Sequence, residues 1–266
     1  MFSVLMSLYS KEKPDNLDQC LSSLYAQTRK ADEIILVYDG PVTEELQAVV
    51  EKWQPLLMLT LVKLEKNVGL GNALNAGLNR CTHDLVARMD TDDICLPQRF
   101  EKQIAFMDAN PGVSLLGAAV TEFDEHGKER LKSLPVTYSE ICHFARLKNP
   151  FNHMCVVFRK QAVISAGSYQ HHLFMEDYNL WLRMMAEGQQ MANLPDVLMR
   201  VRAGSEMVSK RRGWPYIKSE IQLFKLKNKL KQVPLLTGSI YFLIRTSTRV
   251  IPTGLMKYLY ERDRGK

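Results

Sequence analysis

Three carboxylates that follow a short apolar segment are the strongest chemical signal in the chain. Segment 85–89 carries apolar side chains on both faces of an extended chain, as a buried strand does, and Asp90, Asp92 and Asp93 come directly after it. Carboxylates so close together repel one another unless a cation or hydrogen-bond donors lie among them. Ligands that are all oxygen suit a hard divalent ion, Mg²⁺ or Mn²⁺. The alternative is that the acids only begin the helix expected from Pro97.

Glu176 and Asp177 form a second acidic pair, at the start of a helix expected over 176–187. One interpretation is that this pair supplies a general base, which takes a proton from an acceptor hydroxyl. The other is that the positive end of the helix dipole favours acids there, whatever the function. His153 lies in a polar loop that leads into an expected strand. It is a candidate ligand contact, with a structural role as the alternative.

Asp39 and a small-residue loop are candidates for binding a nucleotide. Asp39 ends an expected strand, and its carboxylate can accept from a base N–H or a ribose hydroxyl, or else belong to an Asp-Gly turn. The loop residues that let backbone approach a nucleotide are Asn67, Gly69, Gly71 and Asn72. The loop has neither the G-x-G-x-x-G nor the G-K-S/T pattern, and a turn with a helix N-cap is the alternative.

Arg200 and Arg202 are spaced to point the same way from an extended segment. Two guanidinium groups on one side of a strand can bind a diphosphate through charge-assisted hydrogen bonds. The alternative for both residues is a salt bridge to nearby acids.

The elements that must position these residues alternate between strand and helix. Strands are expected at 2–8, 33–37, 57–63, 85–89 and 113–123, and helices at 15–25, 43–53, from 71 and at 97–109. Asp15 or Asn16 is expected to cap the first helix. A charged hairpin turn at 124–132, a helix at 138–147 and a strand at 154–158 follow. Such alternation predicts an α/β fold with a mostly parallel wound sheet, whose ligand site lies past the carboxyl ends of the strands.

Chain length, cysteine pattern and apolar runs restrict the class of protein. A chain of 266 residues can bury the core of one large α/β domain with an appendage. Its cysteines are scattered without a C-x-x-C pair, which indicates free thiols in a reducing compartment: Cys20, Cys81, Cys95, Cys142 and Cys155. We expect no signal peptide, because the apolar run 2–8 is too short and lacks a basic region before it, and we expect no membrane-spanning helix, because no run of apolar residues is long enough.

Charge divides the chain into two parts. Residues 207–266 carry 14 Lys and Arg against 3 Asp and Glu, whereas the first 206 residues carry 21 against 26. We therefore expect a catalytic domain over 1–208 and a basic amphipathic helical tail over 209–266, and no nucleic acid as a partner. The basic residues of the tail precede the apolar stretch 235–244: Lys210, Arg211, Arg212, Lys218, Lys225, Lys227, Lys229 and Lys231. They suggest attachment to an anionic membrane surface, unless the helices only pack on the body with a solvated basic face.

Seven segments of the chain resemble the family 2 glycosyltransferases in order and spacing. They are 3–9, 32–40, 67–75, 89–93, 152–159, 175–181 and 199–202. The resemblance covers residues 1 to about 210 and implies a GT-A fold, with inverting transfer of a sugar from a nucleotide-sugar donor. It implies that Asp39 contacts uracil and that Asp177 is the catalytic base. In the D-x-D motif, Asp90 would contact the ribose or the metal, and Asp92 would bind the metal, with Asp93 as a further candidate ligand.

One departure from the family pattern concerns Arg202. Many relatives have a histidine there that helps to hold the metal. Here the metal either has fewer protein ligands, or Arg202 supplies part of the positive charge for the leaving diphosphate.

The chain length, the D-x-D-D sequence and the basic tail resemble bacterial enzymes that extend sugars linked to a polyprenyl diphosphate. This implies transfer of a hexose, galactose or glucose, from a UDP-sugar to an acceptor such as GlcNAc-diphosphate-undecaprenol, in O-antigen or exopolysaccharide synthesis. The expected cofactor is Mn²⁺ or Mg²⁺, and the expected location is cytoplasmic, on the inner face of the cytoplasmic membrane. The alternatives are a sugar-phosphate nucleotidyltransferase and a non-catalytic protein that binds a membrane surface.

Overall fold

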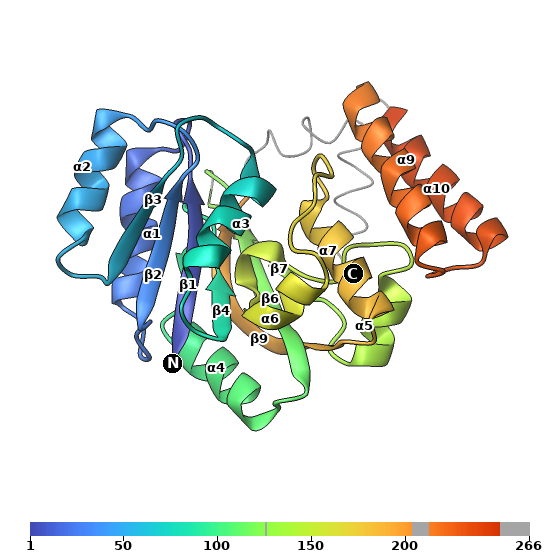
Figure 1. Cartoon of the computed structure of the whole chain (residues 1–266), viewed down its shortest axis with the longest axis horizontal. Coiled ribbons are helices and arrows are strands. Elements are labelled where there is room, and N and C mark those ends of the chain that lie inside the picture. The colour runs from blue at the N-terminus through green and yellow to red at the C-terminus, as the bar shows by residue number, and fades with distance from the viewer. Residues whose placement is uncertain (126, 204–212, 251–266) are drawn as a thin grey trace.

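A nine-stranded sheet forms the centre of the molecule (Figure 1). The structure is a computed structural model that describes residues 1–125, 127–203 and 213–250. The strand order is β3 (Leu59–Lys63), β2 (Glu33–Tyr38), β1 (Phe2–Leu8), β4 (Leu85–Arg88), β8 (Val157–Arg159), β6 (Val113–Phe123), β9 (Gln190–Arg202) and β5 (Ile94–Cys95), with β7 (Glu129–Lys132) paired to β6.

Strands β1 to β4 form the parallel half of the sheet, as the strand–helix alternation predicts. The next strand in space is β8, which pairs antiparallel with both β4 and β6. Strands β6 and β9 are again parallel. β8 can occupy this central position because it is apolar on both faces: Val157 and Phe158 are fully buried and belong to the cores on opposite sides of the sheet. The sheet is therefore mixed and mostly parallel.

Helices cover both faces of the sheet. On one face the core includes residues of α1 (Pro14–Tyr25), α2 (Glu44–Trp53) and α4 (Arg99–Ala109). On the other it includes residues of α3 (Leu70–Arg80), α5 (Tyr138–Phe144), α6 (Lys160–Ser165) and α7 (Glu176–Ala186). A short 3₁₀ helix, His153–Cys155, precedes β8. The alternation predicted for β4 is confirmed, since Leu85 and Ala87 lie in the first core and Val86 in the second.

The start of α1 differs from the expectation. The helix begins at Pro14, and its N-cap is Lys13, whose side chain makes no capping hydrogen bond. Asp15 and Asn16 are therefore inside the first turn and do not cap it. Proline at the first helical position explains the difference, because its fixed φ suits the helix start and it has no N–H to satisfy.

The C-terminal helices α9 (Gly213–Lys229) and α10 (Leu235–Val250) form a hairpin that lies beside α7 (Figure 1). The expected boundary between residues 208 and 209 falls outside the described residues, as do Lys210, Arg211 and Arg212. One expectation for this region is wrong: Lys227 does not contribute to a basic surface, because it is 4% exposed. In the described part of the chain, no helix has the length and apolar character needed to cross a membrane.

Candidate active site

The three acids after β4 lie together at the carboxyl edge of the parallel strands. Asp90, Asp92 and Asp93 each offer a carboxylate oxygen, and these oxygens lie within 4.8 Å of one another. Asp93 is only 1% exposed, while Asp90 and Asp92 are half-buried. The cluster predicted from spacing is therefore real in three dimensions.

Asp93 is held by one hydrogen bond and keeps one oxygen available. Its Oδ1 accepts from the backbone N–H of Arg202 at 2.9 Å. Its Oδ2 is buried and has no hydrogen-bond partner among the described residues. Burial raises the pKa of Asp93, and the charges of Asp92 and Asp90 add to that shift. A buried carboxylate oxygen without a donor, beside two further carboxylates, fits a hard divalent cation.

Asp92 has a fourth acid close by. Burial, followed by the charges of Asp90 and Glu12, raises the pKa of Asp92 to about 7. Glu12 lies in the loop after β1 and accepts a hydrogen bond from the Thr91 hydroxyl at 3.0 Å. Sequence reasoning missed Glu12. The available signal was the polar turn after β1, because the loops that follow parallel strands lie at the same edge of the sheet.

The positive charge of Arg88 offsets part of the negative charge of the acid cluster. Its guanidinium is buried and makes a two-pronged contact with the Asp90 carboxylate, with Nη1 donating to Oδ2 at 2.7 Å. A guanidinium matches a carboxylate in this way through two parallel hydrogen bonds. Asp90 is therefore fixed in orientation, and Arg88 is a second site residue that sequence reasoning did not single out.

Asp39 holds the small-residue loop in place. Its carboxylate accepts from the backbone N–H of Val68 at 2.7 Å, from that of Gly69 at 3.2 Å and from the Asn67 side chain at 3.0 Å. Gly40 has φ +86°, and a Cβ on it would lie 2.6 Å from the Asn67 nitrogen, so only glycine fits. These contacts bring the first turn of α3 to the carboxyl edge of β2.

Asn72 closes the same loop from inside α3. Its side chain donates to the Val68 carbonyl at 2.9 Å, and the residue is exposed at the surface. Gly69 is the N-cap of α3 with φ +85°. Both the turn and the helix start weighed as alternatives for this loop are therefore present, and a role in donor binding stays a prediction.

Asp177 lies in the first turn of α7, and its carboxylate Oδ2 accepts from the Asn149 side chain at 2.6 Å. Its neighbour Glu176 packs against the first turn of α3, where a Cβ on Gly71 would lie 3.4 Å from Glu176 Cγ. Burial raises the pKa of Glu176. The first turns of α3 and α7 are therefore in contact, and the small-residue loop lies beside the second acidic pair.

Tyr169 is buried beside the first turn of α3. Burial raises the pKa of its hydroxyl; the Arg88 charge opposes this shift, and the charges of Asp177 and Asp90 add to it. A Cβ on Gly71 would lie 3.4 Å from Tyr169 Cβ, so Tyr169 lies beside the first turn of α3. Its partner is His153, whose Nε2 lies 2.9 Å from the Tyr169 oxygen.

His153 is half-buried between Tyr169 and Trp181. Its ring packs edge-on against Trp181 at 6.0 Å between centroids, and burial, helped by the Arg88 charge, lowers its pKa well below the usual range. The imidazole is thus neutral near pH 7 and positions Tyr169, which favours the structural alternative.

The two arginines of β9 lie on one side, as expected. Their guanidinium carbons lie 4.6 Å (Arg200) and 4.8 Å (Arg202) from the centroid of the Phe123 ring. Arg200 donates to Glu129 at 2.5 Å, which is the salt bridge considered as the alternative. Arg202 instead donates to the Asp92 carbonyl at 3.2 Å and to Gln19 at 3.1 Å. Arg202 therefore borders the acid cluster, and Arg200 is engaged further along the strand.

Sequence comparison decides the family. The model described as "Glycosyl transferase family 2" matches residues 3–173. The chain belongs to this family. A relative from Erwinia amylovora, "Amylovoran biosynthesis glycosyltransferase AmsE", is 70% identical over 99% of each chain. An Escherichia coli relative, "UDP-Gal:alpha-D-GlcNAc-diphosphoundecaprenol beta-1,3-galactosyltransferase", is 37% identical over 98% of this chain and 95% of that one.

A solved structure has a similar fold. Residues 1–349 of S. aureus TarS in complex with UDP-GlcNAc match with a TM-score of 0.70 at 18% identity, over 92% of this chain and 72% of that one. A likeness at that identity concerns the fold, and the fold is GT-A, as the sequence resemblance implies. The family model ends before Glu176 and Asp177, and the roles expected for these acids stay predictions.

Proposed function

We propose that this family 2 glycosyltransferase moves a hexose, galactose or glucose, from a UDP-sugar to a lipid-diphosphate-linked sugar such as GlcNAc-diphosphate-undecaprenol, with inversion at the anomeric carbon. The observation that carries the proposal is the acid cluster at the carboxyl edge of the parallel strands: carboxylate oxygens of Asp90, Asp92 and Asp93 lie within 4.8 Å of one another, and the buried Oδ2 of Asp93 has no hydrogen-bond partner among the described residues. The names of the two relatives support the acceptor class and a role in exopolysaccharide or O-antigen synthesis.

In the proposed reaction, Asp177 accepts the proton of an acceptor hydroxyl while that oxygen attacks the anomeric carbon. The bond from the anomeric carbon to the diphosphate oxygen breaks on the opposite face, and UDP leaves with the bonding pair. Asn149 holds the base in one orientation through its hydrogen bond to Oδ2. A base fixed in this way reacts without reorganisation, which is where positioning contributes to the rate.

The donor side is assigned to the acid cluster and the α3 loop. Asp90, Asp92 and Asp93 would hold a bound Mn²⁺ or Mg²⁺, which would act as a Lewis acid toward the charge that develops on the leaving diphosphate. Asp39 orders the loop that approaches the nucleotide. Arg202, where many relatives have a histidine, places a positive charge beside Asp92 and can attract the diphosphate.

The tail is assigned to the membrane surface. Apolar side chains of α10 remain largely exposed, as do lysines of α9 and of the turn that follows it: Leu235, Leu236, Ile240, Leu243 and Ile244, and Lys218, Lys225, Lys229 and Lys231. An apolar helix face with lysines around it binds anionic interfaces. We therefore place the enzyme on the inner, cytoplasmic face of the membrane, with a catalytic domain over 1–208 and an attachment region over 209–266.

A donor and acceptor screen tests this function. UDP-Gal, UDP-Glc, UDP-GlcNAc and UDP-GalNAc are each incubated with a synthetic GlcNAc-diphosphate-lipid, and the product anomer is read by NMR. We expect acceptor-dependent UDP release with UDP-Gal or UDP-Glc and an inverted anomeric configuration. A product of retained configuration, or diphosphate release from UTP and a sugar phosphate in place of sugar transfer, would contradict the proposal.

A further inference from the structure

The α9–α10 hairpin contacts the short segment that leads into the proposed base. In this segment, residues 171–178, Ser219 donates to the Leu173 carbonyl and accepts at its own carbonyl from His172 Nε2 at 2.9 Å. Gln222 donates to the His171 carbonyl at 2.8 Å. The hairpin thus fixes the backbone immediately before α7.

Aromatic packing and a buried lysine extend this contact. The Phe174 ring stacks on the Tyr216 ring of α9 at 5.1 Å between centroids, and Phe174 has φ +67°, which is unusual for a residue other than glycine. Lys227 donates to the Tyr178 hydroxyl at 2.8 Å. Residues on both sides of Asp177 are therefore tied to the hairpin.

The same hairpin holds the hydrogen-bond partner of the base. Lys227 donates to the Arg146 carbonyl at 2.8 Å, and Arg245 Nη1 donates to the Leu147 carbonyl at 2.7 Å. These carbonyls lie two and three residues before Asn149, whose side chain donates to Asp177. The backbone that presents Asn149 is thus anchored to α9 and α10.

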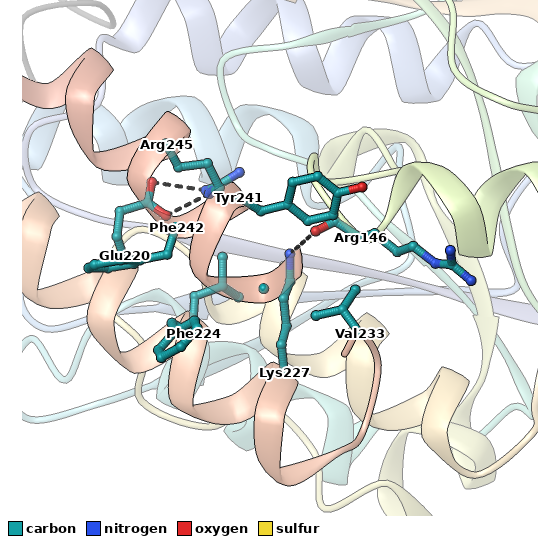
Figure 2. A pocket seen from close by; sticks show the side chains of 10 residues that line it. Arg146, Glu220, Phe224, Lys227, Val233, Tyr241, Phe242 and Arg245 are labelled. Atoms are coloured by element: carbon teal, nitrogen blue, oxygen red, sulfur yellow. Dashed lines mark hydrogen bonds and ion pairs between the residues drawn. The ribbon is translucent and has the colours of Figure 1, made fainter. Parts of the chain in front are cut away.

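Arg245 joins the two contacts. Its guanidinium pairs with the buried Glu220 carboxylate at 2.6 Å and 2.9 Å (Figure 2). While Nη1 holds Leu147, Nη2 also approaches the Met175 sulfur at 3.9 Å. A planar guanidinium whose donors are fixed in this way sets the spacing between its partners. Leu147 precedes Asn149 by two residues, and Met175 precedes Asp177 by two residues.

We infer that Arg245, oriented by Glu220, is a positioning residue for the general base, and that the α9–α10 hairpin belongs to the acceptor machinery as well as to the attachment surface. The inference rests on the proposed function, in which Asp177 takes the acceptor proton. Removing Arg245 leaves donor-site residues untouched but frees the backbone on both sides of the Asp177–Asn149 hydrogen bond.

A double-mutant cycle on the full chain tests this inference. The variants are Arg245→Met, Asp177→Asn and their combination, assayed with UDP-Gal and a GlcNAc-diphosphate-lipid. We expect Arg245→Met to lower kcat by about 10- to 100-fold, the range associated with misplacing a reactive group by an ångström. Calorimetry should give a UDP affinity within about twofold of the parent. In the Asp177→Asn background, Arg245→Met should cause no further loss, because it acts through the group already removed.

Two further variants separate positioning from folding. Arg159→Met is the matched control, because Arg159 also pairs with an acid and donates to two backbone carbonyls, but lies at the opposite end of β4. It should leave kcat unchanged. Glu220→Gln keeps the side-chain shape and should give a smaller loss with the same non-additivity, which keeps the test open if Arg245→Met does not fold.

Two results would overturn the inference: an unchanged kcat in folded Arg245→Met, or an equal loss from Arg245→Met with and without Asp177. Failure of the proposed function has a different signature, since Asp177→Asn would then retain transfer.

Discussion

The backbone N–H of Arg202 donates to Oδ1 of Asp93 at 2.9 Å, although the two residues are 109 positions apart. This bond fastens the end of β9 to the acid cluster that follows β4. It leaves Oδ2 of Asp93 buried beside Asp90 and Asp92. The cluster is therefore built by long-range contacts of the fold. Its metal dependence, the close approach at Gly40 and the titration of Lys227 can each be tested directly.

Metal dependence is the first. We expect EDTA to abolish transfer reversibly, with Mn²⁺ or Mg²⁺ restoring it after dialysis, because the cluster contains only oxygen ligands. Asp92→Asn should lower kcat by about 100-fold or more, as removal of an electrostatic contribution to the transition state does. Asp196→Asn, at an exposed ion pair with Lys102, is the control and should behave as the parent. Full activity in excess EDTA would refute the metal assignment.

The second is the close approach at Gly40. We expect Gly40→Ala to weaken UDP binding and to destabilise the fold, because it combines a positive φ with a Cβ 2.6 Å from the Asn67 nitrogen. Gly188→Ala is a matched control: Gly188 has φ +74°, and no described atom lies within 4 Å of its added Cβ. Backbone strain alone should cost about 1–3 kcal/mol in either variant, measured by urea unfolding. Equal UDP affinity in both variants would show that the loop does not bind the donor.

The third concerns Lys227 and pH. Burial, reinforced by the Arg245 charge and opposed by Glu220, lowers the pKa of Lys227 from 10.5 to about 7. Between these values the unfolded chain binds more protons at this site than the folded chain does. This lysine therefore makes the free energy of unfolding rise with pH across that window, by at most ~1.4 kcal/mol per pH unit for one proton. Below the window it adds no slope.

Urea unfolding of Lys227→Met and of the exposed control Lys229→Met, from pH 7.5 to 9.5, measures this contribution. The slope of stability against pH should fall only in Lys227→Met. An unchanged slope in Lys227→Met would show that the pKa of Lys227 is not lowered in the folded protein.

Membrane attachment calls for substitutions that leave the hairpin folded. Leu236 and Leu243 are exposed on α10, so replacing both by Asp should preserve the contacts to residues 171–178. We expect binding to anionic vesicles to fall roughly tenfold or more, as apolar burial at the interface is lost. The control replaces Leu56 and Met58 by Asp; both are also exposed, and they lie before β3. Identical sedimentation of both double variants would remove support for the attachment surface.

Much of the fold could be predicted because its pattern is local. Alternation within 85–88 and the helical spacing of Leu17, Cys20, Leu21 and Leu24 are read from neighbouring residues, and the burial they predict is observed. The position of β8 could not be read in this way. Only its pairing with β4 and β6 places it in the middle of the sheet.

The same distinction explains the site. Asp90, Asp92 and Asp93 are adjacent in sequence, whereas Glu12 reaches Thr91 across 79 residues and Asn149 reaches Asp177 across 28. Lys227 was misassigned because its charge suggested a surface. It nevertheless shares a helical face with Tyr216, Glu220 and Leu223, the positions that α9 buries. A charged residue on an otherwise buried stripe was the available signal.

The identity of the base is the central claim, and Asp177→Asn tests it most directly. Transfer from UDP-Gal or UDP-Glc to a GlcNAc-diphosphate-lipid is measured beside calorimetric UDP-sugar binding, with Glu176→Gln as the neighbouring control. Asp177→Asn should lower the transfer rate by about 100-fold or more, as expected for removal of a general base. Its donor affinity should stay near the parent value, and Glu176→Gln should lose less transfer. Loss of donor affinity in Asp177→Asn, or transfer at the parent rate, would contradict the central claim.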